Sequence, residues 1–145
     1  MADKAITIAD AWARFGDAGR LALIGGALAL PLRRGDWNGS FDGLTAILAS
    51  SATCKAIKPF VDERRPNGED NESFPSQHAA ECFAAGLALR RHLGEPTGAA
   101  AIGGATLVAM SRLFARKHWT IDVVAGIAIG AASAIAVAAY EGRSA

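Results

Sequence analysis

The sequence predicts an all-α fold, a helical bundle of about five apolar helices with a short additional helix at the N-terminus. Apolar runs recur along the 145 residues at lengths that suit helices, and no β alternation of useful length appears. Alanine is abundant and there are 16 glycines, small residues that allow helices to pack closely. The length suits one core, so residues 1–145 are expected to form a single domain.

The first three helices are expected before residue 58. A short amphipathic helix over residues 5–16 is followed by an apolar helix over 21–32. Residues 35–39 are expected to form a polar loop, and a third helix covers 43–57. This third helix would carry Lys58 to one end of the bundle.

A long polar segment separates these helices from the rest. Residues 59–75 contain three prolines, an Asn67-Gly68 turn signal and a cluster of charges. A loop of this length inside a compact domain is more often functional than not. Further helices are expected over 76–91, 97–112 and 119–140.

The last helix has the properties of a membrane span. Residues 121–140 contain one charge, Asp122, and a span needs about 20 apolar residues. Gly126 and Gly130 form a small-xxx-small face on which a neighbouring helix can pack. We therefore expect a protein associated with a bilayer.

The composition limits the partners of the chain. The formal net charge is +1 and aromatic residues make up 7%, which argues against nucleic acid as a partner. Hydrophobic residues make up 51%, a value between those of a soluble enzyme and of a polytopic membrane protein. Cys54 and Cys82 match no metal or redox spacing, so they are expected to be buried thiols.

Polar and charged residues gather in three short segments at the ends of the apolar helices. Charged residues at such edges are costly unless they have a function, so the three segments form a candidate active site. They are Lys58-(six residues)-Arg65-Pro66, Pro75-Ser76-Gln77-His78, and Ser111-Arg112-(five residues)-His118-(three residues)-Asp122.

His118 and Asp122 lie four residues apart at a helix start, so they share one face. A carboxylate in this position can accept the Nδ1 proton of the imidazole. That contact fixes the tautomer and leaves Nε2 as a free nucleophile. The pair therefore predicts nucleophilic catalysis by His118.

The other polar residues suit an anion. Ser76 is expected to cap the following helix, which would direct the amides of Gln77 and His78 at a bound anion. His78, in the first turn of that helix, could protonate a leaving oxygen. Three cations match a group with two or three negative oxygens: Lys58, Arg65 and Arg112.

The three cations make a metal ion unnecessary, so neither a metal nor a cofactor is expected. The acidic residues of the polar segment are close in sequence but lack the spacing of metal ligands. They are Asp62, Glu63, Glu69, Asp70 and Glu72.

The three segments resemble the signature of the type 2 phosphatidic acid phosphatase superfamily, which is similar to bacterial class A acid phosphatases and vanadium haloperoxidases. That signature is Lys-x6-Arg-Pro, then Pro-Ser-Gly-His, then Ser-Arg-x5-His-x3-Asp. The first and third segments match it fully, and the second departs only at Gln77, where the family has glycine. The resemblance extends from residue 58 to the C-terminus, with the signature over 58–122, and implies a small bacterial lipid phosphatase with the helical fold of this family.

The resemblance implies a role for each residue. His118 would attack phosphorus and become a phosphohistidine, and Asp122 would orient and stabilise it. His78 would protonate the leaving group and then activate water. The remaining residues would hold the phosphate oxygens: Lys58, Arg65, Ser76, Gln77 and Arg112.

The glutamine at position 77 tests this alignment. Glycine would let the backbone approach the phosphate closely, whereas glutamine keeps the N–H and adds bulk. We expect the substitution Gln77→Gly to retain or raise phosphatase activity.

The expected activity is metal-independent hydrolysis of a phosphate monoester or pyrophosphate of a membrane lipid. Candidate substrates are phosphatidate, a prenyl pyrophosphate carrier, phosphatidylglycerol phosphate and a lipid A phosphate. If the helices cross a membrane in alternation, the signature lies on one side and three basic sites on the other: Arg33-Arg34, Arg90-Arg91 and Arg143. Positive loops favour the cytoplasm, so the active site would face the periplasm or exterior of a bacterial inner membrane.

Three alternatives remain open at the level of sequence. A soluble, non-specific acid phosphatase would use the same residues. A vanadate-dependent haloperoxidase would bind vanadate in the same pocket. A helical membrane protein with a decayed site would bind anionic lipids without turnover, and Gln77 is the residue that favours this alternative.

Overall fold

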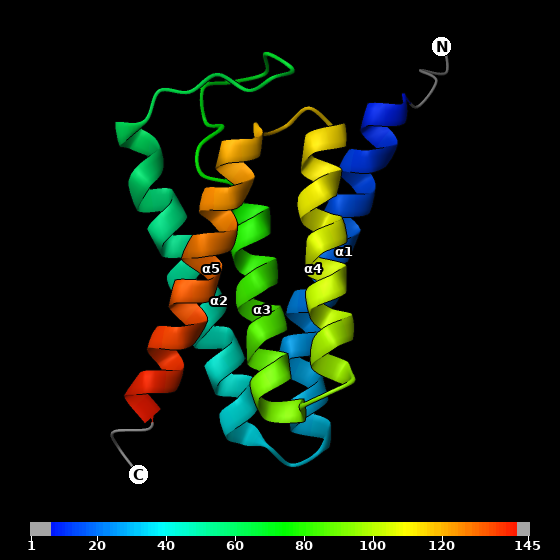
Figure 1. The fold of residues 1–145 in the computed structure, drawn as a ribbon, viewed down its shortest axis with the longest axis vertical. Helices are drawn as coiled ribbons and strands as arrows, with labels where there is room; N and C mark the ends of the chain where they lie inside the picture. The colour runs from blue at the N-terminus through cyan, green and yellow to red at the C-terminus, as the bar shows by residue number, and fades with distance from the viewer. Residues whose placement is uncertain (1–6, 142–145) are drawn as a thin grey trace, which may run out of the picture.

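The computed structural model describes residues 7–141 and confirms the all-α prediction. Arg143, which contributed to the expected charge asymmetry, lies outside these residues. The described chain forms five helices and one short 3-10 turn, η1, that continues from the second helix (Figure 1). Their bounds are α1 Ile8–Arg33, α2 Trp37–Ile57, η1 Lys58–Phe60, α3 Gln77–Leu93, α4 Thr97–Phe114 and α5 Thr120–Glu141.

Helix α3 occupies the centre of the bundle. It packs against each of the other four helices, which surround it in the order α4, α1, α2, α5, while α4 and α5 barely touch each other (Figure 1). The segment between η1 and α3 lies across one end of the bundle and then turns back into it to reach the start of α3 (Figure 1). The N-terminus of α3 is therefore recessed below the ends of its neighbours.

The structure differs from the sequence prediction at the first helix. The segments 5–16 and 21–32 were expected as two helices, but α1 is continuous from Ile8 to Arg33. It begins at a capping box in which Thr7 and Asp10 bond to each other's backbone N–H groups. No proline lies between the two segments, and Gly16 is tolerated inside the helix because it packs directly against α4.

Helix α2 also begins earlier than expected. Residues 37–42 are helical because Asp36 acts as the N-cap, with its side chain accepting a hydrogen bond from the Gly39 amide at 2.8 Å. The polar composition of residues 35–39 therefore marks the cap and the first turn of α2 rather than an extended loop.

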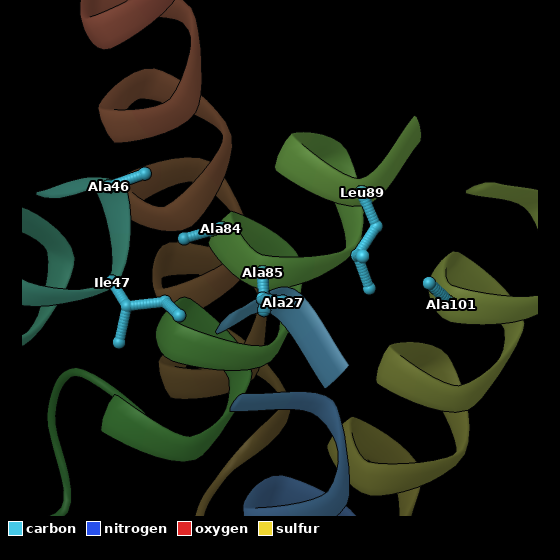
Figure 2. Close-up of a cluster of buried hydrophobic side chains, with 7 residues drawn as sticks. All are labelled: Ala27, Ala46, Ile47, Ala84, Ala85, Leu89 and Ala101. Carbon is cyan, nitrogen blue, oxygen red and sulfur yellow. The ribbon is translucent and has the colours of Figure 1, made fainter. Parts of the chain in front are cut away.

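Small side chains form most of the core. One buried cluster joins four helices around α3, and Figure 2 shows how short its side chains are. Its members are Ala27, Ala46, Ile47, Ala84, Ala85, Leu89 and Ala101. Because alanine adds so little volume, the helix backbones approach closely and fix one another's positions.

The small face of α5 packs on α3, as the spacing of its glycines predicts. A Cβ atom at Gly126 would lie 2.3 Å from the Ser76 carbonyl oxygen, and one at Gly130 would lie 2.2 Å from that of Ala80. Only glycine permits this approach. The contact presses the start of α5 against the start of α3, where the second and third signature segments meet.

Three helices are long and apolar enough to span a membrane: α1, α4 and α5. Large apolar side chains are exposed on the outside of the bundle, among them Leu21, Phe41, Leu107 and Ile135. A monomer in water rarely exposes so much apolar surface. Both cysteines are free and buried, as predicted.

Candidate active site

A polar pocket of about 370 Å³ opens at the end of the bundle that carries the long loop. It is formed by α1, the loop, the start of α3, the end of α4 and the turn before α5. Charged side chains and histidines dominate its wall. The lining residues are Ala13, Asp17, Arg20, Lys58, Arg65, Glu69, Asp70, Glu72, Gln77, His78, Arg112, Lys117 and His118.

The fold brings all three signature segments to this pocket. Six of the eight predicted site residues line it: Lys58, Arg65, Gln77, His78, Arg112 and His118. The other two, Ser76 and Asp122, are fully buried. Ser76 precedes Gln77 at the start of α3, and Asp122 lies one turn beyond His118 in α5.

His118 is held in a defined tautomer. Its Nδ1 lies 2.7 Å from the carbonyl oxygen of Ser73, which can only accept, so Nδ1 carries the proton. Burial, followed by the nearby Arg65, lowers the pKa of His118 to about 3. The ring is therefore neutral near pH 7, and its Nε2 carries a lone pair.

The role predicted for Asp122 needs a correction. Its Oδ2 lies 3.7 Å from Nδ1 of His118, beyond hydrogen-bond distance, and the Ser73 carbonyl takes the proton instead. Asp122 Oδ2 accepts hydrogen bonds from the Ser73 hydroxyl and, at 2.7 Å, from the Trp119 amide. Asp122 is thus linked to His118 through Ser73, whose hydroxyl bonds to Asp122 and whose carbonyl oxygen bonds to His118.

The loop that carries Ser73 is well tethered. Ser73 N donates to the Glu63 carbonyl oxygen at 3.0 Å, and Arg65 N donates to the Asp70 carbonyl oxygen at 2.9 Å. These two bonds join the two halves of the loop. Ser76 N donates to the Asp122 carbonyl oxygen at 3.0 Å. The acidic segment is therefore a folded wall of the site.

The three predicted cations converge on the pocket, each held by an oxygen. Lys58 Nζ donates to the Glu72 carbonyl, and burial lowers the pKa of this lysine. Arg65 Nε lies 2.6 Å from Asp70 Oδ1. Arg112 is 4% exposed and donates to Asp17 Oδ1 at 3.2 Å. Its Nε has no hydrogen-bond partner among the described residues.

Ser76 occupies the N-cap position of α3, as predicted, but its side chain makes no capping hydrogen bond. Its buried hydroxyl also has no other partner within the described chain. The first amides of α3, including those of Gln77 and His78, lack intrahelical acceptors by their position. This helix start therefore presents unpaired donors beside the pocket.

The side chain of Gln77 bonds to neighbouring side chains of α2 and α3. Its Nε2 donates to Glu81 Oε1 at 2.7 Å and to Ser51 Oγ at 2.9 Å, and Glu81 is also paired with Arg20. The extra bulk relative to glycine is thus accommodated between α2 and α3, in a hydrogen-bond network beneath the pocket.

Sequence reasoning missed four residues of the site. Asp17 and Arg20 come from α1, in the stretch between the two helices expected over residues 5–16 and 21–32. Lys117 lines the pocket and pairs with Glu69 of the loop, and Ser73 positions His118. Only Lys117 and Ser73 carry a local signal, because they lie within or next to the signature segments. Within residues 7–141, no group of three or more potential metal ligands gathers.

The fold and the pocket define a class of protein, an all-α bundle with a polar pocket in which cationic side chains lie beside a neutral histidine. The family comparison agrees with this description. Residues 41–144 match the PAP2 superfamily, the type 2 phosphatidic acid phosphatases, so the chain belongs to this superfamily. No solved structure shows a significant match.

Curated relatives support the assignment. Two are decaprenylphosphoryl-5-phosphoribose phosphatases, from Mycobacterium tuberculosis (35% identical over 77% of this chain) and Mycolicibacterium smegmatis (36% over 83%). The matches span 64% and 71% of these relatives. A lipid A 1-phosphatase from Porphyromonas gingivalis is 32% identical over 46% of this chain and 16% of its own length.

Proposed function

We propose that this protein is a metal-independent phosphatase that hydrolyses a phosphate monoester or pyrophosphate of a membrane lipid through a phosphohistidine on His118. One observation carries the proposal: a neutral imidazole, tethered at Nδ1, lines a pocket that also receives Lys58, Arg65 and Arg112. A nucleophile and cations that can hold three phosphate oxygens are thereby combined in one recess.

In the first half-reaction, Nε2 of His118 attacks phosphorus while the leaving oxygen departs from the opposite side. The Ser73 carbonyl stabilises the developing imidazolium through Nδ1–H. His78 gives a proton to the leaving oxygen. In the second half-reaction His78 takes a proton from water, the water oxygen bonds to phosphorus, and the bond to His118 breaks.

Charge on the phosphoryl oxygens is met by donors that are already in place. The two arginines and Lys58 are fixed before substrate arrives, which removes the cost of reorganising them in the transition state. The unpaired hydroxyl of Ser76 and the unpaired Nε of Arg112 supply two further donors.

A lipid substrate follows from the surroundings of the pocket. Helix α5, one of the three candidate spans, is apolar over 21 residues, about 30 Å at about 1.5 Å per residue, which matches the hydrocarbon core of a bilayer. Exposed aromatic residues lie near both of its ends, with Trp119 just before its start and Tyr140 near its end. The pocket would then lie at one interface, where the phosphate of an amphiphile is located.

The relatives narrow the substrate class. Two of them act, by name, on a polyprenyl-linked phosphoribose and one on lipid A 1-phosphate. We infer that this chain acts on a phosphate carried by a lipid anchor. The end of the bundle opposite the pocket holds Arg33, Arg34, Arg90 and Arg91, but the pocket end holds at least as many basic residues, among them Lys58, Arg65 and Lys117. The positive-inside rule therefore does not orient the bundle. We propose an active site that faces the periplasm or exterior of a bacterial inner membrane as the arrangement to test.

The proposal is tested with purified protein in detergent. Phosphate release from a panel of lipid phosphates is measured with EDTA present, for the wild type and for His118→Ala. We expect turnover by the wild type alone, and a phosphorylated protein that is stable in alkali and labile in acid after a brief reaction. Activity that EDTA removes contradicts the metal-independent mechanism, and equal activity in His118→Ala contradicts the assignment of the nucleophile.

A further inference from the structure

Helix α1 brings a carboxylate into the pocket from outside the signature segments. Asp17 Oδ1 lies 2.8 Å from Nε2 of His78 and 3.2 Å from NH1 of Arg112. One oxygen atom thus contacts both the proposed general acid and a proposed phosphate-binding group. The Asp17 side chain is 60% exposed, whereas that of Arg112 is 5% exposed, so the carboxylate reaches these groups from the mouth of the pocket.

The packing of α1 on α4 fixes this contact. A Cβ atom at Gly16 would lie 2.3 Å from Ser111 Oγ and 2.9 Å from Arg112 NH1, so glycine allows the two helices to meet here. NH1 of Arg112 also donates to the carbonyl oxygen of Ala13, one turn before Asp17, at 3.3 Å. The position of Asp17 is therefore set by contacts of its helix with α4 at Gly16 and at Ala13.

The contact determines which nitrogen of His78 can serve the substrate. An ionised carboxylate only accepts, so Nε2 of His78 carries a proton and is engaged by Asp17. The protonated ring carries its second proton on Nδ1. His78 is thus held at Nε2, which leaves Nδ1 for substrate, whereas His118 is held at Nδ1, which leaves Nε2.

An imidazolium in this pocket needs a negative partner. Burial, followed by the nearby Arg112, lowers the pKa of His78 to about 4, so the protonated form is disfavoured in the free pocket. The negative charges of Asp17 and of a bound phosphate oppose this shift. Asp17 is the carboxylate in direct contact with the ring. The charges that act on the ring are Asp17 and Arg20 from α1 and Arg112 from α4. The other charged and titratable groups that line the pocket are Lys58, Arg65, Glu69, Asp70, Glu72, Lys117 and His118.

We propose that Asp17 is a positioning residue for the leaving-group step, holding Nε2–H of His78 so that Nδ1–H protonates the leaving oxygen. This inference rests on the phosphatase function proposed above. As the bond from phosphorus to the leaving oxygen breaks and the bond to His118 forms, the Nδ1 proton passes to that oxygen. His78 becomes neutral while Asp17 stays ionised, and in the second step Nδ1 takes a proton from the attacking water.

The test compares two leaving groups. An alkyl phosphate monoester in detergent micelles expels an alkoxide that needs a proton, whereas p-nitrophenyl phosphate expels a stable phenolate that does not. General acid catalysis contributes about 10²–10⁴-fold. We expect Asp17→Asn to lower kcat/KM by at least about tenfold for the alkyl phosphate and by less than about threefold for the aryl one.

Two further readouts separate positioning from a structural role. The alkaline limb of the kcat/KM profile should move to lower pH in Asp17→Asn, because an imidazolium without its carboxylate loses its proton more readily. His78→Ala should show the same preference for the aryl substrate, and adding Asp17→Asn to it should cost little more. Asp10→Asn, on the same helix, is the charge-matched control and should leave both rates unchanged.

The outcomes are distinct. Equal losses on both substrates would mean that Asp17 only supports the fold, and this overturns the inference. Tighter binding of inorganic phosphate by Asp17→Asn with an unchanged ratio of the two rates would mean that Asp17 merely competes with phosphate for Arg112, which also overturns it. A wild type that releases phosphate from neither substrate contradicts the proposed function itself.

Discussion

The two ends of the bundle each hold a histidine beside carboxylates, yet only one end forms a site. At the end opposite the pocket, Nδ1 of His92 lies 3.0 Å from Asp36 and its Nε2 lies 2.9 Å from Asp42. Both nitrogens are thus engaged by carboxylates, and the cavity that His92 lines, about 20 Å³, has room for little more than one water. At the pocket end, His118 is tethered at Nδ1 and the cavity is about 370 Å³.

The difference shows what separates a structural histidine from a candidate nucleophile. His92 connects the cap of α2, the body of α2 and the end of α3, so its bonds hold the bundle together. Nδ1 of His118 bonds to the Ser73 carbonyl oxygen, and Nε2 remains to react with substrate. A nearby carboxylate is common to both, so it is the unoccupied nitrogen and the converging cations that mark the active site.

The largest expected effect comes from the arginines of the two ends. Arg112 pairs with Asp17 at 3.2 Å and Arg91 pairs with Asp42 at 3.4 Å, so they form a matched pair. Arg112→Ala should lower kcat/KM by about 10²–10³-fold, because it removes a donor from the phosphoryl oxygens. Arg91→Ala should leave activity nearly unchanged. The measurement is the rate of phosphate release. Comparable losses in the two variants would contradict the assignment of the active site to one end of the bundle.

A smaller effect is expected from Ser73→Ala. Its hydroxyl links Asp122 to the segment whose carbonyl tethers His118. A lost hydrogen bond to a charged group is worth about 1.5–3 kcal/mol, so we expect kcat to fall by about 10- to 150-fold.

Asp122→Asn provides the comparison for this variant. If Asp122 acts through Ser73, its loss should be of similar size, and the double variant should be little worse than either single one. A direct bond between Asp122 and His118 would instead make Ser73→Ala nearly silent and Asp122→Asn severe. Single-turnover rates for phosphate transfer to His118 distinguish the two results.

The smallest effect on activity is expected from Gln77→Gly. Gln77 lines the pocket, but its side-chain amide is engaged by Ser51 and Glu81, while its backbone N–H is retained in the variant. Turnover should be kept or raised. The free energy of unfolding should fall by about 1–2 kcal/mol, through the lost bond to Glu81 and the added helical glycine. Folded protein without activity would mean that the glutamine takes part in the site.

Much of the fold could be predicted because its signals are local. Prolines, glycines and apolar runs placed the helices after residue 58 to within about two residues. The first helix was divided in error, since nothing in the sequence shows that Gly16 packs against α4. The early start of α2 was missed because the capping of Gly39 by Asp36 resembles a loop signal.

The candidate site could be predicted where spacing along the chain carries the chemistry. The sequence alone named the histidines, the cations and Asp122, because each lies at a fixed distance from others in its segment. The structure decided what spacing cannot encode. It placed Asp17 against His78 although 61 residues separate them. It also showed that Nδ1 of His118 bonds to the Ser73 carbonyl oxygen and not to Asp122. Both depend on how closely helices meet, and that is set by small side chains packing in three dimensions.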